Sequence, residues 1–202
     1  IRFHSPKKFG DNLTSDREGI KIVVEEKKFI KGFEEGKFFN GYRFIYPIFY
    51  ENNYIGSVEV SISMATLIEI ITDLYKELDV FFMMDGNIVE KIVFDDMMGN
   101  YEKIEIFQNY YFDKEVKEVS LRNTKVFNNK KLKEFFQDTD INEKLKNNEN
   151  FNFIKKIDNE YYLAQFISIK NIGNSHVAYM MSISKISHYK DIFSKYLLIF
   201  FL

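Results

Sequence analysis

The stretch from Gly32 to Ser63 constrains the fold of this chain more than any other. It holds two runs suited to β-strands: Tyr42–Tyr50 is dense in aromatic and β-branched residues, and Tyr54–Ser63 alternates apolar and polar residues. Between them, Glu51-Asn52-Asn53 is a polar turn, and asparagine tolerates a positive φ. The pattern therefore predicts an antiparallel β-hairpin.

A single charged residue interrupts the first of these strands. Arg43 falls on the same predicted face as Ile45 and Phe49, and a guanidinium among apolar side chains needs an anionic partner. Two alternatives remain open. Either Glu34 or Glu59 pairs with Arg43 as part of the scaffold, or Arg43 faces a cavity that takes a ligand carboxylate. A turn of three or four residues leaves it open whether Glu59 shares the face of Arg43.

Composition narrows the class of protein. The 202 residues are 46% hydrophobic and 17% aromatic, which is enough to bury a core. The net charge of −2 argues against nucleic acid as a partner. The chain has no cysteine, which excludes disulfides, zinc–thiolate sites and cysteine nucleophiles.

Catalytic motifs are missing from the sequence. The three histidines, His4, His176 and His188, are far apart, and no HExxH, GxSxG, Walker A or glycine-rich dinucleotide motif occurs. Asp95-Asp96 has the pattern of the first turn of a helix rather than of a metal site. We expect no enzyme activity, no catalytic residue, no cofactor and no metal.

The period of the apolar residues changes along the chain. It predicts a helix over Asp16–Lys28 and an amphipathic helix over Met64–Leu78, with a domain boundary at the end of the second. Beyond this boundary, Asp85-Gly86-Asn87 separates the apolar runs Val80–Met84 and Ile88–Phe94, which predicts a second hairpin.

The last third of the chain repeats the order of the first. Two helices and three strands are predicted, at Lys131–Phe136, Ile141–Leu145, Phe153–Ile157, Tyr161–Ile169 and Val177–Ile183. Ser182-Ile183-Ser184 ends the last hairpin as Ser61-Ile62-Ser63 ends the first, and a helix is expected after each. The sequence therefore predicts two related α+β modules in tandem, residues 1–78 and 79–202.

The predicted closing helix runs from about Lys185 into the apolar run Tyr196–Leu202. Seven residues are too few to cross a bilayer, which takes about 20. The run is either a helix end packed on the core or the first turns of a transmembrane helix. A core helix would show a polar face within two turns, so we favour the transmembrane alternative.

Four segments resemble one family. The segments RFHSPKKFGDNL, GFEEG, GYRFIYPIFY and YIGSVEVSIS are similar to the double Cache family, the extracytoplasmic sensory domains of bacterial histidine kinases, chemoreceptors and cyclic-dinucleotide enzymes. The similarity covers residues 1–63 in motif and the remainder only in the order of elements. It implies two PAS-like modules with antiparallel central sheets. The first, membrane-distal module would be truncated at its N-terminus, because the family's upstream transmembrane helix and long first helix are absent here.

The resemblance and the residue pattern point to the same candidate site. Arg2 and His4 lie two residues apart, so a strand places them on one face, and with Arg43 they form three groups suited to an anion. Glu34 would receive an amino group. The candidate ligand-binding residues are Arg2, His4, Glu34, Arg43, Tyr46 and Glu59. Each also has a plain structural alternative, since His4 precedes Pro6 as a turn residue does and aromatic stripes on strands usually belong to a core.

We therefore expect an extracytoplasmic ligand-sensing domain of a bacterial transmembrane receptor. It would lie in the periplasm or outside the cell, bind a small carboxylate or amino acid, and signal through its C-terminal helix. The membrane would be reached through that helix, and the full-length receptor would be a homodimer. The alternative is a non-catalytic interaction or structural module with a vestigial pocket.

Overall fold

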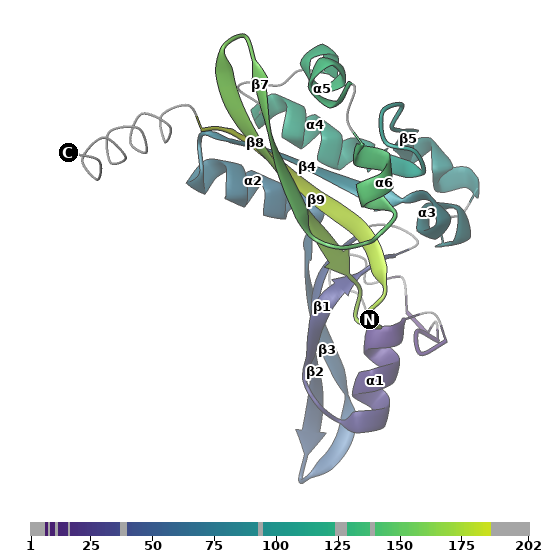
Figure 1. The fold of residues 1–202 in the computed structure, drawn as a ribbon. Coiled ribbons are helices and arrows are strands. Elements are labelled where there is room, and N and C mark those ends of the chain that lie inside the picture. Colours follow the sequence, from purple (N-terminus) through teal and green to yellow (C-terminus); the bar gives the residue numbers. More distant parts are fainter. Residues whose placement is uncertain are drawn as a thin grey trace, which may run out of the picture. The chain divides into compact units, whose positions relative to one another are not determined.

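The computed structural model describes residues 7, 9–10, 12–15, 17–36, 40–92, 95–123, 129–137 and 140–186. These residues form an α+β fold with two antiparallel sheets, one of three strands and one of six (Figure 1). This confirms the predicted fold class. The chain divides into two compact units: Ile1–Ser63 with Lys170–Ser175, and Met64–Ile169 with the residues from His176 onward.

The first unit consists of one helix and a sheet in the order β1-β2-β3. Its elements are α1 (Glu18–Glu26), β1 (Ile30–Glu34), β2 (Gly41–Tyr50) and β3 (Asn53–Ser63). The predicted hairpin is present as β2 and β3. Its loop is shorter than predicted, because only Glu51 and Asn52 connect the strands, with φ angles of 46° and 66°. Two positive φ angles are typical of the type I′ turns that match the twist of paired strands.

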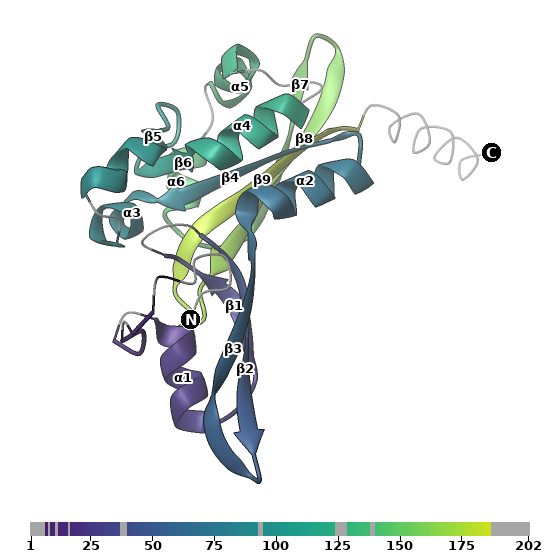
Figure 2. The same ribbon diagram turned by 180° about the vertical axis from the view of Figure 1, so that it is seen from behind.

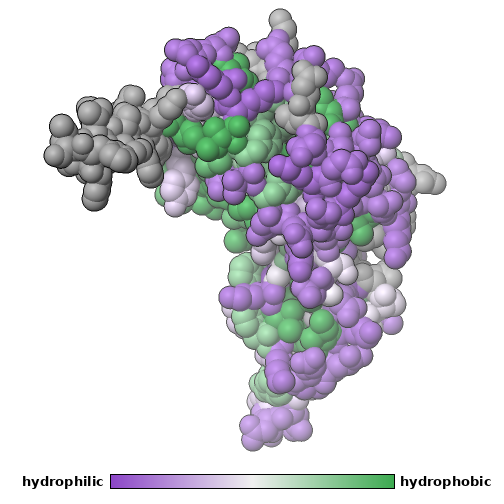
Figure 3. Space-filling view, in the orientation of Figure 1, coloured by the Kyte–Doolittle hydropathy of each residue, from purple (hydrophilic) through white to green (hydrophobic). Residues whose placement is uncertain are grey.

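The two faces of this sheet differ in burial. Helix α1 contacts all three strands, and on the covered face Ile45 is fully buried. On the other face Tyr46 is 45% and Val60 58% exposed. Figure 3 shows hydrophobic residues at the surface of this unit. The alternation of the hairpin thus gives one buried face, as the sequence predicts. The other face is also apolar, and among the described residues it is open to solvent.

The second unit is built on six strands in the order β5-β6-β4-β9-β8-β7. Helices α2 and α4 contact each other and β4 (Figure 2). The elements are α2 (Met64–Leu74), β4 (Leu78–Asp85), α3 (Gly86–Ile92), the 3-10 helix η1 (Asp95–Asn100), β5 (Tyr101–Lys103), β6 (Tyr110–Asp113), α4 (Lys114–Asn123), α5 (Asn129–Phe136), α6 (Ile141–Leu145), β7 (Phe151–Ile157), β8 (Glu160–Lys170) and β9 (His176–Lys185). The predicted helix over Ile141–Leu145 and the three closing strands are confirmed.

Aromatic rings hold the core of this unit together. Phe166 on β8 is 1% exposed, and its ring centroid lies 4.5 to 6.4 Å from five others. These rings belong to Phe107, Phe136, Phe151, Phe153 and Tyr179. Edge-to-face and offset pairs at such distances stabilise beyond the area that they bury, so helix α5 and strands β7, β8 and β9 meet around one side chain.

The prediction of a second hairpin is wrong. Residues 86–92 form helix α3, not a strand paired with β4. The Asp85 carboxylate accepts a hydrogen bond from the Asn87 N–H at 2.8 Å, and the Gly86 N–H donates to the Asn109 carbonyl at 2.7 Å. An Asp-Gly pair suits the start of a helix as well as a hairpin turn. Here β4 finds its partners in β6 and β9 instead.

Two other expectations also need correction. The helix predicted over Met64–Leu78 ends at Leu74, and Leu78 already begins β4. Lys185 ends strand β9 rather than beginning a helix. The apolar run Tyr196–Leu202 lies outside the described residues, among which no helix is long and apolar enough to cross a membrane.

We predict that this core loses stability in alkali because of Tyr179. Burial, with smaller contributions from Glu149 and Asp85, raises its pKa to about 12, from an ordinary value of 10.0. Between these two values the unfolded chain releases the proton while the native state keeps it, so the free energy of unfolding falls as the pH rises through this window. Denaturant unfolding at a series of pH values should show a shallower fall for Tyr179→Phe. Tyr75→Phe, which changes an exposed tyrosine, is the control, and equal slopes for Tyr179→Phe and wild type would contradict the prediction.

Candidate functional site

The candidate site is a cluster of charged side chains on the covered face of the first sheet. Arg43 on β2 lies opposite Gly32 of β1 and Ser61 of β3, and the next inward residue, Ile45, lies opposite Glu59. Residues directly opposite each other in an antiparallel pair point to the same face. The register therefore places Glu59 on the face of Arg43, which the sequence alone left open.

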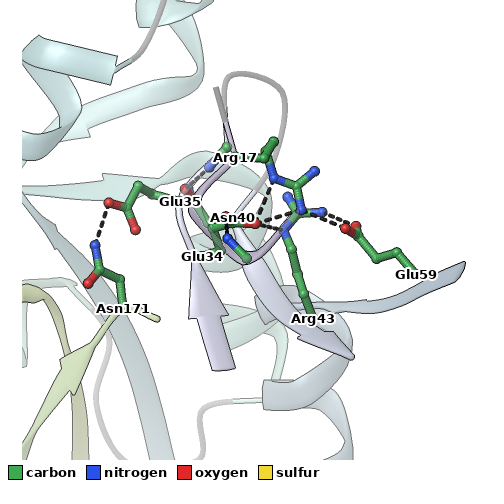
Figure 4. Close-up of polar contacts among 9 residues, drawn as sticks. Arg17, Glu34, Glu35, Asn40, Arg43, Glu59 and Asn171 are labelled. Atoms are coloured by element: carbon green, nitrogen blue, oxygen red, sulfur yellow. Dashed lines mark hydrogen bonds and ion pairs between the residues drawn. The ribbon is translucent and has the colours of Figure 1, made fainter. Parts of the chain in front are cut away.

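Arg43 pairs with both nearby glutamates. Its Nη1 lies 2.7 Å from Glu59 Oε1, and its Nε lies 3.3 Å from Glu34 Oε2. Arg17 completes the cluster, because its Nε donates to Glu34 Oε2 at 2.6 Å and its Nη2 to Glu59 Oε2 at 2.7 Å (Figure 4). Two guanidinium groups and two carboxylates thus alternate, and their charges sum to zero.

Glu34 also fixes helix α1. Its Oε1 accepts the backbone N–H of Gly19 at 3.0 Å, and Gly19 lies in the first turn of the helix. The N-cap residue Arg17 provides no capping hydrogen bond from its own side chain. A carboxylate at a helix N-terminus satisfies a free donor and complements the helix dipole. One side chain of β1 therefore neutralises arginine and caps the helix.

Exposure changes across the cluster. The side chains of Arg43 and Glu34 are 5% and 6% exposed, whereas those of Arg17 and Glu59 are 16% and 21% exposed. Burial lowers the pKa of Arg43, as does the positive charge of Arg17, while Glu59 and Glu34 raise it. The inner pair is thus closed off from water, and the outer pair is the part that a solute can reach.

Three of the six predicted site residues come together here: Glu34, Arg43 and Glu59. Tyr46 does not join them. It follows Ile45 directly on β2, and successive side chains of a strand point to opposite faces, so Tyr46 and Arg43 face away from each other. The Tyr46 ring instead stacks on the ring of Phe29, with 4.3 Å between the centroids, and the prediction that it shares a site with Arg43 is wrong. Arg2 and His4 lie outside the described residues.

Arg17 is the member of the cluster that the sequence analysis missed. A signal for it exists in composition, since only four of the 28 basic residues are arginines, and three of these are Arg2, Arg17 and Arg43. Arginine, unlike lysine, offers a planar fork of donors that suits paired carboxylates. Its concentration near the N-terminus, in a chain that otherwise uses lysine, marks the region of the site.

The cluster is built for charge pairing. Both carboxylates are engaged by guanidinium groups, and no group of three histidine, aspartate or glutamate side chains within the described part of the chain is arranged to hold a metal ion. The cluster thus offers two cations and two anions with which a zwitterionic or carboxylate solute can form ion pairs.

No protein-family model matches the chain, and no curated protein matches it. Several solved structures are similar to the chain. For a chemoreceptor sensory domain from Campylobacter jejuni, the identity is 13% and the TM-score 0.37, over 93% of this chain and 61% of that one. For a methyl-accepting chemotaxis protein, the identity is 12% and the TM-score 0.36, over 89% of this chain and 58% of that one.

The extracellular domain of a putative histidine kinase is similar at 9% identity and a TM-score of 0.31, over 85% of this chain and 56% of that one. The chain therefore spans little more than half the length of these structures.

Proposed function

We propose that this chain is the ligand-sensing part of a bacterial transmembrane receptor and binds a small carboxylate or amino acid at the Arg17–Glu34–Arg43–Glu59 cluster. The domain would face the periplasm or the exterior. Its first module, which we place in residues 1–78, would lie distal to the membrane. The second module would lead into the membrane through the C-terminal helix of a dimeric receptor, and the domain itself would catalyse no reaction.

The observation that carries this proposal is the difference in exposure within the cluster. Arg17 and Glu59 are about three times as exposed as Arg43 and Glu34. The carboxylate of a ligand can pair with the Arg17 guanidinium, and the ammonium group of a ligand can pair with the Glu59 carboxylate. Arg43 and Glu34 then hold the remaining charges, so an exchange of partners leaves no buried charge unpaired.

The second candidate function is a non-catalytic interaction or structural module. It is favoured by the internal closure of the cluster, in which every charged group already has a partner of opposite sign. In that case all four residues are scaffold. The two functions differ in what Arg17 does, because only the sensor requires Arg17 to exchange its partner.

We predict that an amino acid or small carboxylate raises the melting temperature of the purified chain. A ligand in about 100-fold excess over its Kd stabilises the folded state by about 2.7 kcal/mol. The probes are the individual L-amino acids, the matching carboxylic acids and the matching amines, in a thermal-shift screen. Arg17→Lys keeps the charge but loses the planar fork, so it should abolish the shift given by an active probe.

The control for this screen is Arg122→Lys, which changes an arginine in the second unit and should leave the shift intact. A screen in which no probe stabilises the wild-type chain contradicts the sensor. An active probe whose shift survives Arg17→Lys contradicts the assignment of the site.

The inner pair should behave as scaffold in either function. We predict that Arg43→Ala lowers the free energy of unfolding of the first unit by about 3–5 kcal/mol, since it leaves two carboxylates around the single guanidinium of Arg17 and so one uncompensated negative charge beside the buried Glu34. Asp73→Asn removes the exposed ion pair with Lys76 and should cost about 1 kcal/mol or less. Denaturant unfolding followed by circular dichroism measures both, and a loss for Arg43→Ala as small as that for Asp73→Asn would show that the inner pair holds nothing together.

A further inference from the structure

The loop that joins β8 to β9 has an unusual position in the fold. Strand β9 and all of β8 except its last residue, Lys170, belong to the second unit, but the segment Lys170–Ser175 belongs to the first. Strand β9 begins at the next residue, His176, and runs to Lys185. The loop therefore connects the first unit covalently to the strand that leads to the end of the chain.

The loop is tied into a firm shape by its own hydrogen bonds. The Asn171 N–H donates to the Ser175 carbonyl at 2.9 Å, and the Ser175 N–H donates back to Asn171 Oδ1 at 3.0 Å. The Asn174 N–H donates to the Asn171 carbonyl at 2.8 Å, with φ of 63° at Asn174. These three hydrogen bonds restrain the loop.

Two hydrogen bonds fasten the loop to the residues on either side of Glu34. The Ile172 N–H donates to the Phe33 carbonyl at 2.9 Å. The Asn171 side-chain amide donates to Glu35 Oε1 at 2.8 Å (Figure 4). Glu35 Oε2 is buried and has no hydrogen-bond partner among the described residues, so the bond from Asn171 is the one that holds this carboxylate.

The side chain of Ile172 packs against the backbone of α1 and of β1. A Cβ added at Gly32 would lie 2.8 Å from Ile172 Cγ1, and one added at Gly19 would lie 2.9 Å from Ile172 Cδ1. A side chain at either position would have to push Ile172 aside, so the two glycines leave room for this contact. Gly19 is the residue whose N–H is held by Glu34, so Ile172 rests on the helix turn that the cluster caps.

From these contacts we propose that the Lys170–Ser175 loop transmits the state of the charge cluster to strand β9. A change of partners at Glu34 or Glu59 moves the first turn of α1 and the end of β1. Ile172 and Asn171 follow, because they are bound to those backbone and side-chain groups. Ser175 then displaces the start of β9. The role of the loop in signalling rests on the proposed function, but the coupling between the cluster and β9 needs no ligand.

His176 provides a built-in reporter at the start of β9. Its Nδ1 lies 2.7 Å from Ser168 Oγ, and its Nε2 lies 3.2 Å from Tyr110 Oη. Both ring nitrogens thus lie within hydrogen-bond distance of groups in the second unit. A shift of the preceding residue, Ser175, changes these two distances and with them the NMR chemical shifts of the imidazole.

The test is a double-mutant cycle on the full chain without ligand. Glu59→Gln perturbs the cluster, and Ile172→Ala removes the side chain that rests on α1. Wild type, both single variants and the double variant are compared by the His176 imidazole shifts and by hydrogen exchange of the β9 amides. We expect Glu59→Gln to shift His176 and to change β9 exchange about fivefold or more, a factor typical of coupled sites. In the Ile172→Ala background the same substitution should have little effect.

Asn174→Gly is the matched control, because it alters the loop while keeping the positive φ and should preserve the coupling. If Ile172→Ala fails to fold, Asn171→Ala breaks the bond to Glu35 instead. An unchanged His176 in Glu59→Gln, or equal effects in both backgrounds, overturns the coupling. Since no ligand is used, this result is independent of the thermal-shift screen, and either proposal can fail alone.

Discussion

The burial of the Arg43 guanidinium is the constraint on which the first unit depends. Only 4% of this residue is exposed, and an unpaired charge at that depth would cost several kcal/mol. Glu59 reaches it from the neighbouring strand and Glu34 from the strand on its other side. Because Glu34 also accepts the Gly19 N–H, the same charge that neutralises the arginine fixes the start of α1. Hairpin, edge strand and helix are therefore positioned by one side chain.

Two carboxylates around a single guanidinium would leave a negative charge inside the unit. Arg17 removes this imbalance and brings the cluster to neutrality with contacts of 2.6 and 2.7 Å. The geometry separates two tasks, because the inner pair is shielded from water and the outer pair is partly exposed. An ion network of this kind can stabilise a fold and still offer one exchangeable pair, which is why a scaffold role for Arg43 does not exclude a binding role for Arg17.

The parts of the fold that the sequence predicts are those set by local periodicity. The β2–β3 hairpin follows from alternation and from the tolerance of asparagine for a positive φ, and the turn at Asp158-Asn159 has two positive φ angles of the same kind. What local pattern could not supply is the pairing of distant segments. Asp85-Gly86 opens a helix because β4 finds its partners in β6 and β9. Arg17 was missed because its partners lie 17 and 42 residues away, a separation at which no spacing rule applies.

The position of Glu34 between Phe33 and Glu35 links the site to the rest of the chain. Its own carboxylate belongs to the cluster, while the carbonyl before it and the carboxylate after it hold the Lys170–Ser175 loop. Three consecutive residues therefore carry both sets of contacts, and the chain offers no flexible spacer between them. Close-packed groups such as Ile172 against Gly19 and Gly32 pass on a displacement instead of absorbing it, because protein interiors are dense and only slightly compressible. A change at the cluster that displaces the Phe33 backbone while this loop stays in place would have to break the hydrogen bond from the Ile172 N–H to the Phe33 carbonyl.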